Sequence, residues 1–301
     1  MKKFLISIAC FIVLMCVIDR LYGAFCDYLN THPKRGETFY RNYIINEADD
    51  DVIMMGSSRM VHHYVSNIIA DSLGVTVWNA GVDGMGIIMN YGYVKLLLRH
   101  HTPRVIIYDI SPYDFCVEDN VKQLKNLRPY VNDSDIKELF EQVESLERIK
   151  LYSNLVKYNS SLLPLIRDYY KPGGKGDYNG YAPLYGEMSD NMACENDDIT
   201  ERDYIIDDFK INLFDELIAI CQEKGIQLIN VVSPEFCNES TAMANRIGSI
   251  LDGRAIVFDY SYTEGISNNN SLFQDREHLN NDGAVLFTQV LSERLLSIID
   301  L

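Results

Sequence analysis

Residues 52–59 read Val52-Ile53-Met54-Met55-Gly56-Ser57-Ser58-Arg59, a short apolar run that stops at a polar turn. The apolar run predicts a buried strand, and Gly56 allows the tight turn that exposes the residues after it. A helix that begins at this turn would aim its first backbone N–H groups at the same point. Ser58 is therefore the candidate nucleophile by its register after the strand, with Ser57 as the competing hydroxyl.

The chain beyond this turn alternates apolar runs of strand length with amphipathic stretches. This rhythm is typical of a parallel sheet with helices on both faces. We predict an α/β fold, a three-layer flavodoxin-like sandwich with a five-stranded parallel sheet. The predicted strands are 52–55, 75–78, 104–110, 226–232 and 255–259, and the predicted helices of the sandwich are 65–73, 87–100, 207–224, 240–251 and 283–299.

The alternation breaks between about residues 111 and 202. A capping cluster at 132–135 begins a predicted helix from Asp133 to Ile149. The chain then continues to a loop at 171–181 that is rich in glycine and tyrosine. We interpret this region as an insertion of helices and loop over one edge of the domain. Its tyrosines either form a wall for a substrate or pack against the domain.

A second polar segment, Asp275-Arg276-Glu277-His278, lies between the last predicted strand and the last predicted helix. Ligands of open parallel sheets sit outside the carboxyl ends of the strands, so we expect this segment to meet Ser58 at that edge. His278 would accept the hydroxyl proton, and Asp275 would fix the imidazole tautomer. The predicted catalytic residues are therefore Ser58, Asp275 and His278.

Three residues that closely follow Ser58 are candidates for binding: Arg59, His62 and His63. The two histidines lie one turn after Ser58, where they would line the pocket. A helix surface that faces solvent would account for them equally well.

An oxyanion needs two or three hydrogen-bond donors. The backbone N–H of Ser58 is one candidate. The turn from Asn79 to Gly84, which follows the second predicted strand, offers Gly84 as another, and Asn79 is a further candidate for oxyanion or substrate binding. The glycines of this turn also suit an ordinary tight connection between a strand and a helix.

These segments resemble the sequence blocks of the SGNH (GDSL-type) hydrolase superfamily over about residues 50–300. The usual Gly-Asp-Ser is replaced here by Gly56-Ser57-Ser58, which is similar to a membrane-anchored branch that includes alginate-type O-acetyltransferases and the teichoic acid D-alanyl transfer protein. The resemblance implies Ser58 as nucleophile, His278 as base, Asp275 as orienter and Gly84 as an oxyanion donor.

The resemblance also implies a function, an extracytoplasmic serine esterase or O-acyltransferase that acts on an ester-bearing small molecule or a cell-surface glycan. A membrane acyltransferase is the implied protein partner. One block departs from the family, because its third block places an Asn after the third strand, where this chain has Asp109-Ile110-Ser111-Pro112-Tyr113-Asp114. The alternative function is therefore a catalytically weak or inactive accessory or binding protein of a surface polysaccharide assembly.

The N-terminal residues differ in kind from the rest, since Lys2 and Lys3 precede an apolar run of fifteen residues from Phe4 to Ile18. This run is short for a full membrane span of roughly 20 residues, so a cleaved secretory signal competes with an uncleaved anchor. We favour the anchor, because no small-x-small cleavage site follows Ile18. We predict a transmembrane segment at 1–25, a juxtamembrane linker at 26–49 and an SGNH-like domain at 50–301 that lies in the periplasm or at the cell surface, or is secreted if the segment is cleaved.

Composition limits the remaining function classes. A net charge of −16 and a pI near 4.7 argue against nucleic acid or anionic lipid as a partner of the main domain, because an acidic surface repels both. Seven cysteines are spread without a Cys-x-x-Cys pair or a Cys/His pair at ligand spacing, which gives no metal site. No Gly-x-Gly-x-x-Gly follows a predicted strand, and no P-loop lysine is present. The sequence therefore predicts no cofactor.

Overall fold

The structure, a computed structural model, describes residues 1–170, 178–189, 205–236, 248, 251, 255 and 257–299. The chain forms two compact units. We call them the sheet unit, Ile44–Gln123 with Lys175–Leu301, and the helical unit, Met1–Tyr43 with Leu124–Gly174.

The sheet unit is built on five parallel strands in the order β2-β1-β3-β4-β5. The strands are β1 (Val52–Met55), β2 (Val77–Asn79), β3 (Val105–Asp109), β4 (Gln227–Val232) and β5 (Val257–Asp259). The chain reverses its direction of growth across the sheet between β1 and β3, and such a switch point is where open α/β sheets bind ligands. The turn after β1 therefore lies at the position that the fold favours for a site.

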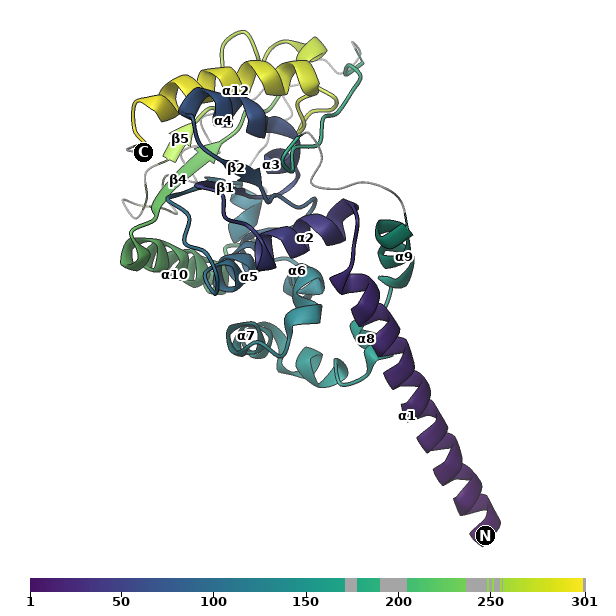
Figure 1. Cartoon of the computed structure of the whole chain (residues 1–301). Helices are drawn as coiled ribbons and strands as arrows, with labels where there is room; N and C mark the ends of the chain where they lie inside the picture. Colours follow the sequence, from purple (N-terminus) through teal and green to yellow (C-terminus); the bar gives the residue numbers. More distant parts are fainter. Residues whose placement is uncertain are drawn as a thin grey trace. The chain divides into compact units, whose positions relative to one another are not determined.

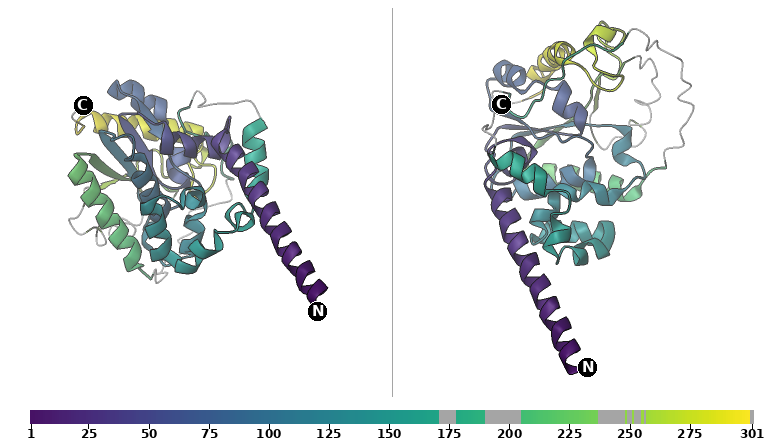
Figure 2. Two further views of the ribbon diagram at one scale, coloured as in Figure 1. Left: turned by 60° about the horizontal axis from the view of Figure 1, so that its bottom comes forward. Right: turned by 90° about the vertical axis from the view of Figure 1, so that its right-hand side faces the viewer.

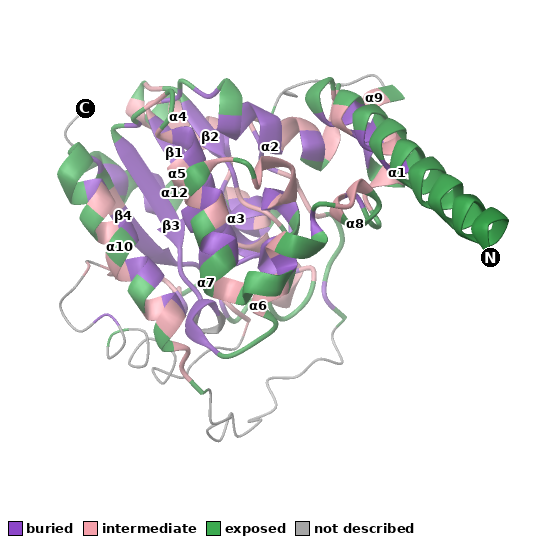
Figure 3. Cartoon of the chain, turned by 90° about the horizontal axis from the view of Figure 1, so that it is seen from below, coloured by how far each residue is buried: buried purple, intermediate pink, exposed green. Residues whose placement is uncertain are grey.

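Helices cover both faces of this sheet (Figure 1). One face carries α4 (Ser66–Leu73) and α12 (Asn281–Leu296), and the other carries α5 (Ile87–Leu97) and α10 (Asp208–Lys224). Side chains of alternate strand residues pack on opposite faces of the sheet. Met54 and Ile107 share a core with Phe287 of α12. Tyr108 instead contacts the ring of Phe214 of α10. The three central strands, whose residues are almost all buried (Figure 3), need apolar side chains on both faces, which explains their continuous apolar sequence. The predicted α/β fold with a five-stranded parallel sheet is confirmed.

Several element bounds differ from prediction. The helix predicted at 87–100 ends at Leu97, and the strand predicted at 75–78 is Val77–Asn79. The last helix begins two residues early, because the Asn280 side chain caps it by accepting the Gly283 N–H. Most of the helix predicted at 240–251 lies outside the described residues.

The helical unit contains α1 (Lys2–Thr31), the 3-10 helix η2 (Lys125–Tyr130), α7 (Ser134–Lys150), α8 (Asn154–Lys157) and α9 (Leu162–Tyr170). Asp133 caps α7 by accepting the N–H groups of Asp135 and Ile136, as the sequence cluster predicts. The second half of α1 packs on α8 and α9 around a small core of Cys26, Leu29, Tyr158 and Leu165.

Helix α1 is long and apolar enough to cross a membrane, and a signal sequence near an N-terminus shares that length and composition. It continues without a break to Thr31 (Figure 2), past the predicted end of the transmembrane segment at residue 25. The predicted linker at 26–49 holds the rest of α1 and a second helix, α2 (Gly36–Asn46), so it is not irregular chain. Two further short elements, η1 (Pro112–Phe115) and α6 (Asn120–Gln123), follow β3 in the sheet unit.

Candidate active site

The turn after β1 places Ser58 at the first position of α3 (Ser58–His63). Gly56 makes this turn possible, because a Cβ at this position would stand 2.9 Å from the Met60 Cβ and 3.1 Å from the Asp109 carbonyl oxygen. The absence of a side chain lets α3 approach the end of β3 closely. Ser58 is half-buried at the carboxyl edge of the sheet.

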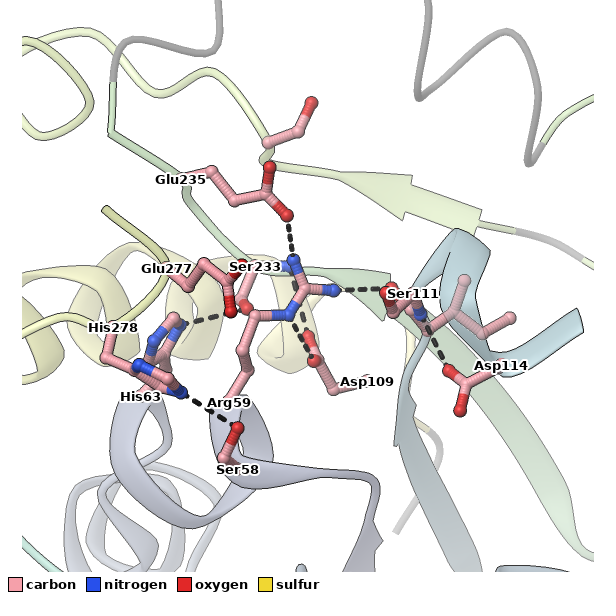
Figure 4. Close-up of polar contacts among 12 residues, drawn as sticks. Ser58, Arg59, His63, Asp109, Ser111, Asp114, Ser233, Glu235, Glu277 and His278 are labelled. Atoms are coloured by element: carbon pink, nitrogen blue, oxygen red, sulfur yellow. Dashed lines mark hydrogen bonds and ion pairs between the residues drawn. The ribbon is translucent and has the colours of Figure 1, made fainter. Parts of the chain in front are cut away.

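The segment before α12 brings an imidazole to this hydroxyl (Figure 4). His278 Nε2 lies 2.8 Å from Ser58 Oγ, although the two residues are 220 positions apart. The other ring nitrogen, His278 Nδ1, lies 2.9 and 3.0 Å from the two Asp275 carboxylate oxygens. A carboxylate only accepts hydrogen bonds, so Nδ1 carries the ring proton and Nε2 is left to accept the Ser58 proton. Ser57 is not the hydroxyl that contacts this imidazole.

Asp275 is fixed by its own loop before it orients His278. Its Oδ1 atom accepts the backbone N–H groups of Glu277 and His278, both at 2.9 Å. Partial burial acts to raise the pKa of Asp275, but these N–H groups and the His278 ring outweigh it and hold the pKa below its usual value. The carboxylate is therefore ionised near neutral pH, as an orienting group has to be.

The two histidines after Arg59 are not on a solvent-facing surface. His63 is fully buried: its Nε2 accepts the Leu279 N–H at 3.0 Å, and its Nδ1 donates to Ser233 Oγ at 2.9 Å. Burial is the main cause that lowers the pKa of His63 well below its usual value, so the ring is neutral. His63 thus holds the residue that directly follows His278.

His62 lies beside the candidate base, with its ring 5.8 Å from that of His278 in an edge-to-face arrangement. Its Nδ1 donates to the Ala182 carbonyl at 2.6 Å, and its Nε2 is 3.4 Å from an Asp83 carboxylate oxygen. Burial acts to lower the pKa of His62, but the Asp83 carboxylate and the Ala182 carbonyl raise it. His62 therefore fastens the turn that contains Asp83 and Gly84 to α3.

The two predicted residues of the turn after β2 differ in their surroundings: Asn79 is buried and hydrogen-bonded, whereas Gly84 is exposed. The Asn79 amide is buried and donates to the Met60 and Tyr64 carbonyls, while its oxygen accepts the Gly81 N–H. The amide of Asn79 is therefore a tie between β2 and α3 and is not free to bind an oxyanion. Gly84 is exposed with φ +66°, and a Cβ there would meet only Lys122 Nζ at 3.8 Å.

Arg59 is also a tie within the fold, which corrects its prediction as a binding residue. Its guanidinium is buried and donates to an Asp109 carboxylate oxygen, to the Ile110 carbonyl and to Glu235 (Figure 4). It therefore joins α3 to the ends of β3 and β4.

Asp109 is the buried acceptor at the place where the resembled family has its third block. It accepts the Tyr64 hydroxyl at 2.5 Å, the Ser233 N–H at 3.1 Å and the Arg59 Nε–H at 3.2 Å. With three donors on it, this carboxylate holds the carboxyl ends of β3 and β4 together. It cannot donate to an oxyanion as the side-chain amide of an Asn would.

Part of the predicted tyrosine-rich loop is described, and it packs against the sheet unit. Asn79 donates its N–H to the Asn179 carbonyl, and Ala182 donates its N–H to the Val61 carbonyl. Tyr181 is 4% exposed and joins the core, so this tyrosine packs against the domain and does not line a wall. Residues 171–177 of this loop lie outside the described residues.

Sequence reasoning did not single out Ser233 and Glu235, which directly follow β4. The signal that located Ser58, a polar residue just past a buried strand, applies to them equally. Asp83 was also missed as the partner of His62, although it directly precedes Gly84, the predicted oxyanion donor.

No family model matches the chain, and no curated protein matches it. Solved structures with a similar arrangement include a protein named as an acylhydrolase from Bacteroides fragilis, at 12% identity and a TM-score of 0.39 over 86% of this chain and 94% of that one. A protein named for platelet activating factor from Streptococcus pneumonia has 11% identity and a TM-score of 0.41 over 90% and 94% of the two chains.

A GDSL-like lipase from Bacteroides thetaiotaomicron has 9% identity and a TM-score of 0.37 over 88% of this chain and 100% of that one. The similar structures are thus named as acylhydrolases and GDSL-like lipases. At these scores the likeness carries no argument about activity, so the chemistry has to be judged from the side chains themselves.

Proposed function

We propose that the chain is a membrane-anchored, extracytoplasmic serine esterase or O-acyltransferase of the SGNH type that acts on a cell-surface glycan through an acyl-enzyme on Ser58. The observation that carries the proposal is the line of contacts from Asp275 through His278 to Ser58 Oγ, with 2.8 Å between the imidazole and the hydroxyl. A hydroxyl is a weak nucleophile near neutral pH, and an oriented imidazole within hydrogen-bond distance is the usual means of activating it.

The geometry supports a two-step reaction. His278 Nε2 takes the proton of Ser58 as Oγ attacks the ester carbonyl carbon, and Asp275 stabilises the imidazolium that forms. The tetrahedral oxyanion would be held by the backbone N–H groups of Ser58 and Gly84. The ester C–O bond then breaks, His278 returns its proton to the leaving alkoxide, and water or a sugar hydroxyl releases the acyl group in a second round.

Contacts within the helical unit support an uncleaved anchor. Asp19 is buried and accepts the backbone N–H groups of Asn154 and Leu155 at the start of α8. Removal of α1 up to residue 25 would leave these two donors without the carboxylate and would expose part of the core around Tyr158 and Leu165. The glycan substrate and a membrane acyltransferase partner rest on the family resemblance of the sequence.

Active-site labelling tests the enzyme proposal directly. A fluorophosphonate probe should label the wild-type chain, and Ser58→Ala should abolish both labelling and the turnover of p-nitrophenyl acetate. Ser57→Ala is the matched control, because its hydroxyl makes no side-chain capping bond and the imidazole contacts Ser58. Equal labelling of the wild type and Ser58→Ala would defeat the proposal.

The second candidate is a catalytically weak or inactive accessory protein that binds a surface polysaccharide. It is favoured by Asp109, a buried carboxylate at the place where the resembled family has an oxyanion-donating Asn. A wild-type chain that binds polysaccharide without any labelling at Ser58 would support this candidate over the enzyme.

A further inference from the structure

The apolar stretch of α1 ends where the helical unit begins to cover the helix. Side chains from Phe4 to Ile18 are exposed, whereas Asp19 is buried against the start of α8. The Asp19 carboxylate accepts from the Ser153 hydroxyl and from the N–H groups of Asn154 and Leu155. Next to it, Arg20 donates to the Tyr152 carbonyl at 2.6 Å. Residues 152–155 are therefore fixed at the level of α1 where its unbroken apolar run ends, and Leu21 and Phe25 add exposed apolar surface just beyond that level.

The length of the apolar stretch sets how deep this level lies in a membrane. Fifteen residues from Phe4 to Ile18 span about 22 Å at 1.5 Å per residue, less than the hydrocarbon core of about 30 Å. A short helix is accommodated by local thinning and by drawing its flanking residues toward the bilayer. Asp19 and Arg20 are therefore expected to lie in the headgroup region. Residues 152–155, which are bonded to them, would lie at the same depth.

Five large apolar side chains are exposed at and just before this level. They are Leu146, Ile149, Tyr152, Leu155 and Val156, with exposed fractions of 58, 60, 68, 43 and 38%. We call this set the collar. It lies on the end of α7, on the turn to α8 and on α8 itself, and Figure 1 shows α8 beside α1. Five exposed large apolar side chains within eleven residues exceed the scattered single ones that are normal on a protein surface.

The cations near the collar are ion-paired and do not form a positive surface. Arg148 pairs with Glu141, Lys150 with Glu147 and Lys157 with Asp27. The affinity for a bilayer therefore has to come from the apolar side chains of the collar. Tyr152 among them combines an apolar ring with a polar end, which suits the headgroup level of a membrane.

We propose that the collar is a second membrane contact, a surface of the helical unit that inserts into the headgroup and upper acyl region of the same bilayer that α1 crosses. The proposal rests on the anchoring of the chain by α1. The contact holds the helical unit against the membrane, so that α1 does not act as a free tether.

The structure provides a matched pair of reporter positions for a test. Tyr152 in the collar and Tyr170 at the end of α9 are 68% and 69% exposed in the same unit. Tyr170 neighbours Tyr169, whose hydroxyl contacts that of Tyr28. Tyr28 lies about 14 Å beyond Asp19 along α1, at 1.5 Å per residue, so the two tyrosines differ mainly in their distance from the membrane level.

The experiment places the full-length chain in vesicles of phosphatidylcholine and phosphatidylglycerol with or without bromine on the upper acyl carbons. The variants are Tyr152→Trp, Tyr170→Trp and, as a reporter of the anchor itself, Phe11→Trp with bromine deep in the acyl chains. The single native Trp78 is buried in the sheet unit and gives a constant background. Bromine quenches tryptophan emission only near contact.

We expect emission from the added Tyr152→Trp reporter to fall about twofold in brominated vesicles, because Trp favours the interface, and that from Tyr170→Trp to stay unchanged. If Phe11→Trp is quenched and Tyr152→Trp is not, α1 is inserted but the collar proposal is overturned. Equal quenching of Tyr152→Trp and Tyr170→Trp also overturns it, since the contact would not be confined to the collar. If Phe11→Trp is not quenched, the anchoring fails and the collar fails with it.

Discussion

Replacing Asp275 by Asn tests whether a fixed tautomer of His278 activates Ser58. Oδ1 of Asp275 accepts two backbone N–H groups, so an Asn would keep its oxygen in that place and put its NH₂ at the Oδ2 position. That position is 3.0 Å from His278 Nδ1, while the retained oxygen is 2.9 Å from it. The ring would then meet a donor beside an uncharged acceptor in place of two carboxylate oxygens, which raises the population of the tautomer with the proton on Nε2. In that tautomer Nε2 cannot accept the Ser58 proton.

The size of the effect follows from the exposure of the carboxylate. In a serine triad with a buried Asp, the same change lowers turnover by about 10⁴-fold. The Asp275 side chain is 52% exposed, so water competes for the amide and lets part of the His278 population keep the productive tautomer. We therefore expect a loss of about 10²- to 10³-fold in the rate of fluorophosphonate labelling, equivalent to about 3–4 kcal/mol.

The assay is the second-order rate constant for labelling of Ser58, which needs no knowledge of the natural substrate. Glu277→Gln is the control, because it removes an exposed carboxylate from the same loop and leaves the hydrogen bonds of the Asp275 side chain in place. A labelling rate for Asp275→Asn within twofold of the wild type would refute the reasoning. An equal loss in Glu277→Gln would show that loop charge, and not the tautomer, sets the rate.

Three further predictions concern stability, each measured by urea unfolding. The pKa of His62 is raised in the folded chain, so its ion pair with Asp83 stabilises the fold while the imidazole is protonated. The difference in free energy of unfolding between the wild type and His62→Gln should therefore shrink as pH rises from about 6 to 9. A difference that stays constant over this range would contradict the prediction. Burial raises the pKa of Asp114 from 3.8 to about 7, so between these pH values the folded chain keeps a proton that the unfolded chain loses. The free energy of unfolding should fall between about pH 4 and 7 by up to about 1.4 kcal/mol per pH unit. Asp114→Asn should abolish that fall. Gly180→Ala, at φ +89°, would place a Cβ 2.0 Å from the Asn79 carbonyl oxygen and should lower the free energy of unfolding by more than about 3 kcal/mol. Gly225→Ala, at φ +70° in open space, should lower it by only about 1–2 kcal/mol. Similar losses in the two variants would contradict the clash at Gly180.

The sheet could be predicted from sequence because its strands are buried on both faces. Runs such as 52–55 and 105–109 are apolar at nearly every position, and they alternate with helices over short distances. Bounds were less predictable where a single side chain decides them. The start of α12 depends on the Asn280 cap, and the end of α5 is marked by no Pro or Gly.

Residue type and distance from Ser58 along the chain did not separate the neighbours of the site by role. Arg59 and Asn79 were grouped with binding residues, yet both are buried ties whose partners come from other elements. The burial of Arg59 depends on Asp109, Ile110 and Glu235, and these residues lie at or just past the ends of two different strands. A polar residue at a sheet edge can face a ligand or another strand end, and the local sequence is the same in both cases.

The sequence alone determined the order of the strands along the chain, the glycine turn before Ser58 and the apolar length of α1, because periodicity, turn geometry and hydrophobic length are local properties. Only the tertiary structure decided that His278 Nε2 meets Ser58 and not Ser57, that His63 is neutral and buried, and that Asp19 caps α8. Each of these depends on groups more than a hundred positions apart, whose approach is set by how the helices and the ends of the strands pack.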